Sequence, residues 1–175
     1  MQFSIHKSIL ILERTPSILE NLTDGLPDEW IYSNEGENTW SPFDVIGHLI
    51  HGEKTDWIPR MRIILNDQGD KKFEVFDRFA QFKASEGKSM QDLLSEFRQL
   101  RMQNLEVLKT LGLNDSILNR TGIHPALGRV TLRQLIATWV THDLSHLSQI
   151  TRVMAKQYKQ EIGPWTEYFN IFKTS

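Results

Sequence analysis

Residues 131–146 read TLRQLIATWVTHDLSH, which is the pattern of an amphipathic helix. Two histidines, His142 and His146, occupy positions on its apolar face where leucines would be expected. Because they are four residues apart, their rings lie one helical turn apart on the same side. A buried imidazole needs a partner for each ring nitrogen, so the pair suggests a shared metal ion. The complete face comprises Leu132, Leu135, Trp139, His142, His146, Ile150 and Val153.

Three other segments have helical periodicity, and together the four predict an all-α fold, a four-helix bundle. Two of the helix starts are marked by a serine N-cap with an aspartate in the first turn, at Ser41 and at Ser89. Prolines predict a kink in the first helix, at Pro16, and a bend late in the second, at Pro59. The expected helices cover about residues 3–21, 41–65, 89–112 and 131–158.

The link between the second and third helices, residues 67–88, is long enough for a crossover instead of a tight hairpin. Its aromatic residues either pack onto the bundle or form an exposed surface for a ligand or a partner. They recur at every third position, as Phe73, Phe76, Phe79 and Phe82. No segment alternates strongly enough to require a strand. The aromatic tail, residues 165–172, is expected to pack on the bundle.

The length and composition are those of one ordinary domain, which we expect to cover residues 1–175. The net charge is −2 and no basic stripe is present, so we expect no binding to nucleic acid. No apolar run approaches the roughly 20 residues that span a bilayer, and the first residues do not resemble a signal peptide. The chain has no cysteine, which fits a cytoplasmic protein and leaves nitrogen and oxygen as metal ligands.

A third histidine, His48, strengthens the prediction of a metal site. It lies on the expected inner side of the second helix, one turn before Gly52, whose small size would let a ligand or another helix come close. Three neutral imidazoles fill three positions around a divalent ion and leave at least one for water or substrate. Zinc, nickel and iron all accept imidazole, so the ligand type does not choose among them. The alternative is that His48 is a core histidine bonded to a backbone carbonyl.

Three further side chains are candidates for lining this site. Asp143 gives the sequence His-Asp-x-x-His, one methylene short of the zinc-protease motif whose acid is a general base. The alternatives are that Asp143 contacts one of the metal-binding residues or that it is solvated. His51, about 60° around the helix from His48, reaches the rim of the site or lies on the surface. His124, in a loop before the last helix, lines the mouth of the site or is structural.

With these histidines placed, the chain resembles the DinB-like family of damage-inducible, metal-dependent hydrolases. The resemblance is carried by WSPFDVIGHL at residues 40–49 and TWVTHDLSHLSQI at residues 138–150. It implies a four-helix bundle with a crossed connection, a homodimer, and a divalent metal, nickel or zinc. By position, the ligands implied are His48, His142 and His146. Some members of the family use low-molecular-weight thiols, including bacillithiol-dependent transferases and mycothiol-dependent isomerases.

These observations leave three hypotheses about function. The leading one is a metal-dependent enzyme that acts on a small molecule, either as a hydrolase or as a thiol-dependent transferase. In the second, the protein is a non-catalytic metal-binding or dimeric interaction module, which a fourth protein ligand such as Asp44, His51 or Asp56 would favour. The third and weakest is a zinc protease, for which the motif has the wrong acid.

Overall fold

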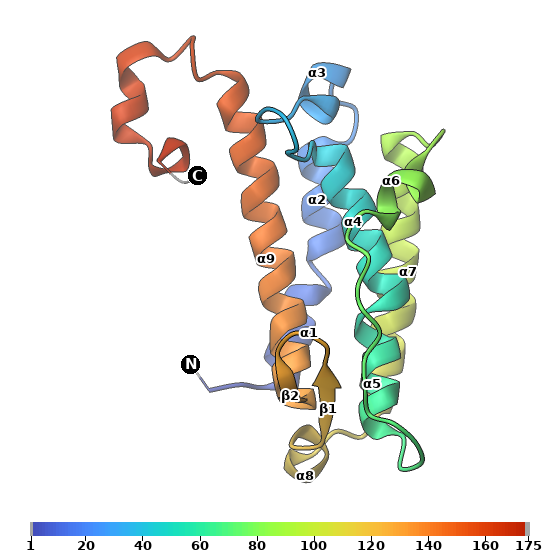
Figure 1. The fold of residues 1–175 in the computed structure, drawn as a ribbon. Coiled ribbons are helices and arrows are strands. Elements are labelled where there is room, and N and C mark those ends of the chain that lie inside the picture. The colour runs from blue at the N-terminus through green and yellow to red at the C-terminus, as the bar shows by residue number, and fades with distance from the viewer. Residues whose placement is uncertain (1, 174–175) are drawn as a thin grey trace.

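The computed structural model describes residues 2–173 and confirms the four-helix bundle (Figure 1). Two of its four arms are broken helices and two are continuous. The arms are α1 (Ile5–Leu12) with α2 (Thr15–Thr23), α4 (Pro42–Thr55) with α5 (Trp57–Leu65), α7 (Met90–Thr110), and α9 (Leu132–Gln157). Short helices lie in the connections: α3 (Asp28–Tyr32), α6 (Ala80–Ser85) and α8 (Asp115–Leu118).

Both breaks in the arms occur beside the two prolines. Pro16 occupies the start of α2, where its missing N–H costs no helical hydrogen bond. In the second arm the helix breaks at Asp56, whose backbone has φ −106° and ψ −70°. Pro59, three residues later, has no N–H to donate to the carbonyl of Thr55, so the regular ladder cannot continue there.

The starts of three arms are fixed by reciprocal capping boxes. Ser41 and Ser89 are the N-caps that the sequence predicts, and each exchanges side-chain and backbone hydrogen bonds with the aspartate three residues later, Asp44 in α4 and Asp92 in α7. Thr131 forms the same arrangement with Gln134 at the start of α9. An N-cap is typically worth about 1 kcal/mol, and these caps set where each histidine-bearing helix begins.

The link between α5 and α7 is a crossover, as expected. It runs back along α5 and α4 to α6, so that α7 has the same direction as α4 and α5 (Figure 1). The link is tied to a hairpin of β1 (Thr121–His124) and β2 (Gly128–Thr131), which pair antiparallel. Ile123 donates its N–H to the carbonyl of Lys71 at 2.8 Å and accepts from the N–H of Phe73 at 2.9 Å. The hairpin was not predicted from the sequence.

The apolar core has two clusters, one in each half of the bundle. One surrounds Trp57 and Trp139, between α5 and α9, and the other surrounds Phe97 and Ile150, between α7 and α9. A buried polar layer lies between them, because its members fall between the two clusters along every arm. These members are Thr15, Glu53, Arg101 and Asp143.

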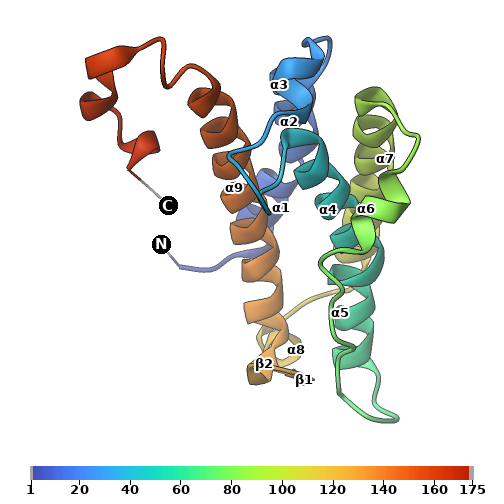
Figure 2. The same ribbon diagram turned by 45° about the horizontal axis from the view of Figure 1, so that its top comes forward.

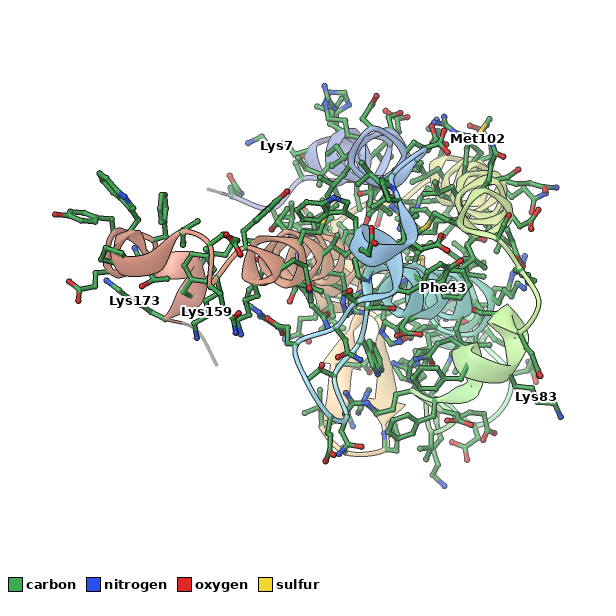
Figure 3. The ribbon with its side chains drawn as sticks, turned by 90° about the horizontal axis from the view of Figure 1, so that it is seen from above. Lys7, Phe43, Lys83, Met102, Lys159 and Lys173 are labelled. Atoms are coloured by element: carbon green, nitrogen blue, oxygen red, sulfur yellow. The ribbon has the colours of Figure 1, made fainter. Side chains whose placement is uncertain are left out.

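The aromatic tail packs on the bundle only through its last part. Its first 3₁₀ helix, η1 (Gly163–Tyr168), leads away from the end of α9, and the second, η2 (Asn170–Phe172), returns to contact α9 (Figure 2). Ile171 and Phe172 are accordingly partly buried. Seen along the bundle, the segment containing Lys159 and Lys173 projects to one side of the four arms (Figure 3). Trp165 is 65% exposed and Tyr168 is 79% exposed. Among the described residues, no helix combines the length and the apolarity that crossing a membrane requires.

Candidate metal centre

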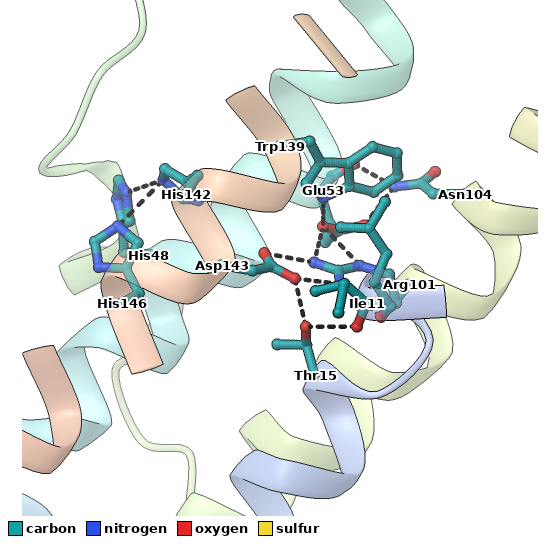
Figure 4. A network of polar contacts seen from close by, with 11 residues as sticks. Ile11, Thr15, His48, Glu53, Arg101, Asn104, Trp139, His142, Asp143 and His146 are labelled. Carbon is teal, nitrogen blue, oxygen red and sulfur yellow. Dashed lines mark hydrogen bonds and ion pairs between the residues drawn. The ribbon is translucent and has the colours of Figure 1, made fainter. Parts of the chain in front are cut away.

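The three histidines singled out in the sequence converge at one point between α4 and α9 (Figure 4). The Nε2 atom of His142 lies 3.1 Å from Nε2 of His48 and 3.2 Å from Nε2 of His146. All three nitrogens fall within 4.8 Å of one another. Their convergence depends on the packing of α4 against α9, since His48 comes from one helix and the pair from the other.

Burial keeps these imidazoles uncharged. Loss of solvation lowers the pKa of His48 to about 3 and that of His142 to about 2, and it also lowers the pKa of His146. Each ring therefore offers an unprotonated nitrogen at neutral pH, which is the form that binds metals. For His146 the ligating atom is defined, because Nδ1 lies 2.8 Å from Oε1 of Gln149 and donates its proton there.

The histidine cluster fits a cation better than it fits a core of bare imidazoles. The three Nε2 atoms point at one another, with contacts of 3.1 and 3.2 Å to Nε2 of His142. Three neutral imidazoles can share only one proton in each contact between them, whereas an ion accepts all three Nε2 lone pairs at once. The donor set and its convergence are thus suited to a divalent metal.

Aromatic rings hold the histidines in place from several sides. The ring of Trp40 lies 4.8 Å from that of His48, and Trp57 meets His142 edge to face at 5.1 Å. Phe76, from the crossover, packs edge to face on His48 at 5.4 Å. These contacts limit rotation of the imidazoles and exclude water from the inner side of the cluster.

A cavity of about 440 Å³ opens beside the histidines. Most of its wall is aromatic or aliphatic, and its charged groups are Asp56, Arg60 and Arg78. The hairpin and the crossover close the side that α4, α5 and α9 leave open. The lining residues are Trp40, His48, Gly52, Asp56, Trp57, Arg60, Phe73, Phe76, Arg78, His124, Leu127, Val130, Gln134, Leu135, Thr138, His142 and His146.

The structure places the three further candidates differently. His124 is part of the cavity wall, at the end of β1. His51 is not; its ring packs on the far side of Phe76, 4.8 Å away, near Thr55. The sequence left two positions open for His51, the rim of the site and the surface, and the structure shows it outside the cavity. It points about 60° away from His48 around α4, which is enough to turn it out of the cavity.

Asp143 corrects the expectation that it lines the site. Consecutive residues on a helix point about 100° apart, so Asp143 faces the core while His142 faces the cavity. Its side chain is fully buried, and its two oxygens accept hydrogen bonds from Arg101 at 2.6 and 3.0 Å (Figure 4). Thr15 donates to it as well, at 2.6 Å. Because its carboxylate lies in the core and is bound by Arg101 and Thr15, Asp143 cannot act as a general base in the cavity.

The partners of Asp143 form a buried network that the sequence did not reveal. Arg101 also donates to Glu53 at 2.8 Å and to the carbonyl of Leu12 at 2.9 Å, and Trp139 donates its indole N–H to Glu53 at 3.0 Å. Burial raises the pKa of Glu53, and the guanidinium of Arg101 opposes that rise. The network joins all four arms directly behind the histidines (Figure 4).

Comparison with known proteins agrees with this fold. A family model described as the DinB superfamily matches residues 11–150. The chain belongs to the DinB superfamily. This DinB protein is similar in structure to YfiT from Bacillus subtilis, with a TM-score of 0.73 and 20% sequence identity over 89% of this chain and 90% of that one. YfiT is described as a probable metal-dependent hydrolase with an unusual four-helix bundle topology. Among curated proteins, none matches the chain.

At that level of identity the similarity to YfiT shows a shared fold, and the site must be argued from this chain. Sequence reasoning found the histidines because they interrupt an apolar face at helical spacing. It missed Arg60 as a cavity residue and considered Asp56 only as a further ligand. Both continue the four-residue spacing of His48 and Gly52, but charged residues on a helix are normally exposed, so they were not expected in the cavity wall.

Proposed function

We propose that the protein is a metal-dependent enzyme that acts on a small molecule, with a divalent ion held by His48, His142 and His146. One observation carries this proposal: three neutral imidazole nitrogens converge within 4.8 Å on the wall of a 440 Å³ cavity. Relatives support it, since YfiT shares the fold and is described as a probable metal-dependent hydrolase.

An open site of this kind favours catalysis over a structural role. Structural zinc sites usually have four protein ligands, whereas catalytic sites have three and leave a position for water or substrate. Among the described residues, the cluster contains three histidines and no carboxylate. Of the candidates for a fourth ligand, Asp44 is engaged in the cap of α4, and His51 lies outside the cavity. Asp56 pairs with Arg60 at 2.8 Å.

The residues of the chain would divide the work as follows. A bound zinc or nickel ion would supply Lewis acidity and lower the pKa of a water or thiol beside it. The three histidines would hold the ion as neutral imidazoles, and Gln149 keeps the proton of His146 on Nδ1, so that Nε2 stays available. Trp40 and Trp57 exclude bulk water on either side of the cluster, which strengthens electrostatic effects there.

The reaction is hydrolysis or transfer to a low-molecular-weight thiol. A chain without cysteine has no thiol nucleophile of its own, so a transferase would take its thiol from solution. Assays with metal-loaded protein separate the two: ester or amide cleavage without thiol, against conjugation of an electrophile that requires thiol. The zinc-protease hypothesis requires Asp143 as a general base beside the metal, but Asp143 binds Arg101 in the core. A homodimer stays a prediction, for light scattering to test.

Elemental analysis tests the metal site directly. We expect about one equivalent of zinc or nickel in the purified chain, and loss of that metal in His142→Ala, His146→Ala and His48→Ala. The control is His51→Ala, one turn from His48 on the same helix and outside the cavity, which should keep the metal. Circular dichroism shows whether each variant remains helical. Full metal content in any of the three cluster variants would contradict the proposal.

A further inference from the structure

The end of the cavity away from the histidines contains hydrogen-bond donors that the fold leaves free. Arg60 and His124 both line this end, Arg60 from α5 and His124 from the hairpin. Phe73 lies between them: the guanidinium of Arg60 is 5.1 Å from its ring centroid, and His124 meets its ring at 6.4 Å. The two polar side chains are therefore brought to one place by a shared aromatic contact.

The proton of His124 can be assigned from its contacts. Its Nδ1 atom accepts hydrogen bonds from the backbone N–H groups of Ala126 and Leu127, at 3.1 and 3.2 Å. An imidazole nitrogen that accepts carries no proton, so in the neutral ring the proton lies on Nε2. Burial, aided by Arg60, lowers the pKa of His124 and keeps the ring neutral. Nε2–H has no acceptor among the described residues and faces away from the turn.

The guanidinium of Arg60 is also only partly used. Its Nε pairs with Asp56 at 2.8 Å, and one Nη reaches the carbonyl of Glu74 at 3.5 Å, the limit of a hydrogen bond. Arg60 is 8% exposed and lines the cavity, so its remaining N–H groups are open to a ligand that enters there. A planar guanidinium with free terminal N–H groups is well suited to binding a carboxylate.

The charge of the cavity agrees with an anionic ligand. Its lining contains two arginines and one aspartate, a formal charge of +1, although the chain as a whole has a net charge of −2. Burial raises the pKa of Asp56 to about 6, which weakens its competition for Arg60 in mildly acidic solution. The rest of the wall includes apolar side chains such as Trp57, Val130 and Leu135.

The spacing of the two ends sets the length of the ligand. His48, Gly52 and Asp56 follow one another at four-residue intervals and all line the cavity. Eight residues of helix correspond to about 12 Å, and Arg60 reaches back to the level of Asp56. We propose that the cavity binds an elongated organic carboxylate, with its carboxylate on Arg60 and His124 and its apolar body leading to the histidines. This names the substrate class of the site proposed above and rests on that proposal.

Binding of octanoate and of octanamide to the full-length chain tests the inference. The two probes have the same length and differ in charge, and isothermal titration calorimetry measures both in EDTA, so that no metal ion can bind the carboxylate. Octanoate should bind about 10- to 100-fold more tightly than octanamide. In Arg60→Gln this preference should disappear. The control Arg62→Gln removes the same charge from an exposed position on α5 and should retain it.

A second measurement does not depend on any variant remaining folded. In wild-type chain with ¹⁵N-labelled histidine, octanoate should shift the Nε2 resonance of His124 and leave that of His6 unchanged. Equal affinity for the two probes, or an undiminished preference in Arg60→Gln, would overturn the inference. So would octanoate binding that requires added zinc and is lost in His142→Ala, because the carboxylate would then lie on the metal; that result would still support the metal site. Conversely, Arg60-dependent binding in a chain that takes up no metal would refute the proposed function and leave the carboxylate site standing.

Discussion

Replacing Arg101 by methionine should destabilise the protein far more than replacing a surface arginine. Arg101 is 1% exposed and is the cation shared by two buried carboxylates, Glu53 and Asp143. Without it, both carboxylates remain in the core with no opposite charge. Breaking a buried ion pair in this way costs about 3–5 kcal/mol. In a chain of this size each kcal/mol lowers Tm by about 2–4 °C, so Tm should fall by about 6–20 °C.

Arg98→Met is the matched control. Arg98 lies on the same helix, and its ion pair with Glu20 is exposed, with 41% and 30% of the two side chains accessible. An exposed pair is worth less than about 1 kcal/mol. Calorimetry and urea unfolding should be performed at pH 7 in EDTA, because a bound metal would add its own stabilisation. The destabilisation of Arg101→Met should shrink as the pH falls and Glu53, whose pKa is raised by burial, becomes protonated. Equal losses in the two variants would refute the reasoning.

Three other perturbations have defined outcomes. In Gly122→Ala the added Cβ would lie 2.5 Å from the ring of Phe73, so the variant should lose about 1–3 kcal/mol in urea unfolding; an unchanged midpoint would contradict the packing. Because burial raises the pKa of Asp56 from 3.8 to about 6, the folded state binds this proton more tightly than the unfolded state. Relative to Asp56→Asn, the wild type should therefore lose up to about 3 kcal/mol as the pH rises from about 4 to above 6; a pH-independent difference would count against the shift. Gln149→Ala removes the acceptor of the His146 Nδ1 proton, so metal affinity should fall about 10- to 100-fold in a chelator competition, and an unaltered affinity would exclude this role.

The sequence was sufficient to predict the bundle and to select the three histidines. The spacing of His142 and His146 within an apolar face has only one geometric meaning on a helix, and the caps at Ser41 and Ser89 depend on residues three positions apart. Such signals are local, so they can be recognised without knowledge of the tertiary structure. His48 was added because of its inward position on the second helix, and the family resemblance then implied the same three ligands.

Features that depend on contacts between distant segments were not predictable in the same way. The strands of the hairpin have four residues each, too short for alternation to be recognised, and they are stabilised by the crossover at Ile123. Charged residues in helices are normally exposed, so nothing in the sequence marks Arg101 and Glu53 as buried partners. Asp143 was expected near the site because it is next to His142 in the sequence, but its side chain points into the core, where it binds Arg101.

The polar layer behind the histidines bears on how the ion is acquired. Glu53 follows His48 on α4, Asp143 follows His142 on α9, and Arg101 clamps both carboxylates, so the two helices that supply the ligands are fastened together without any metal. We therefore expect the site to be assembled before a metal binds, and little refolding to accompany binding. Different divalent ions should then exchange on an intact scaffold.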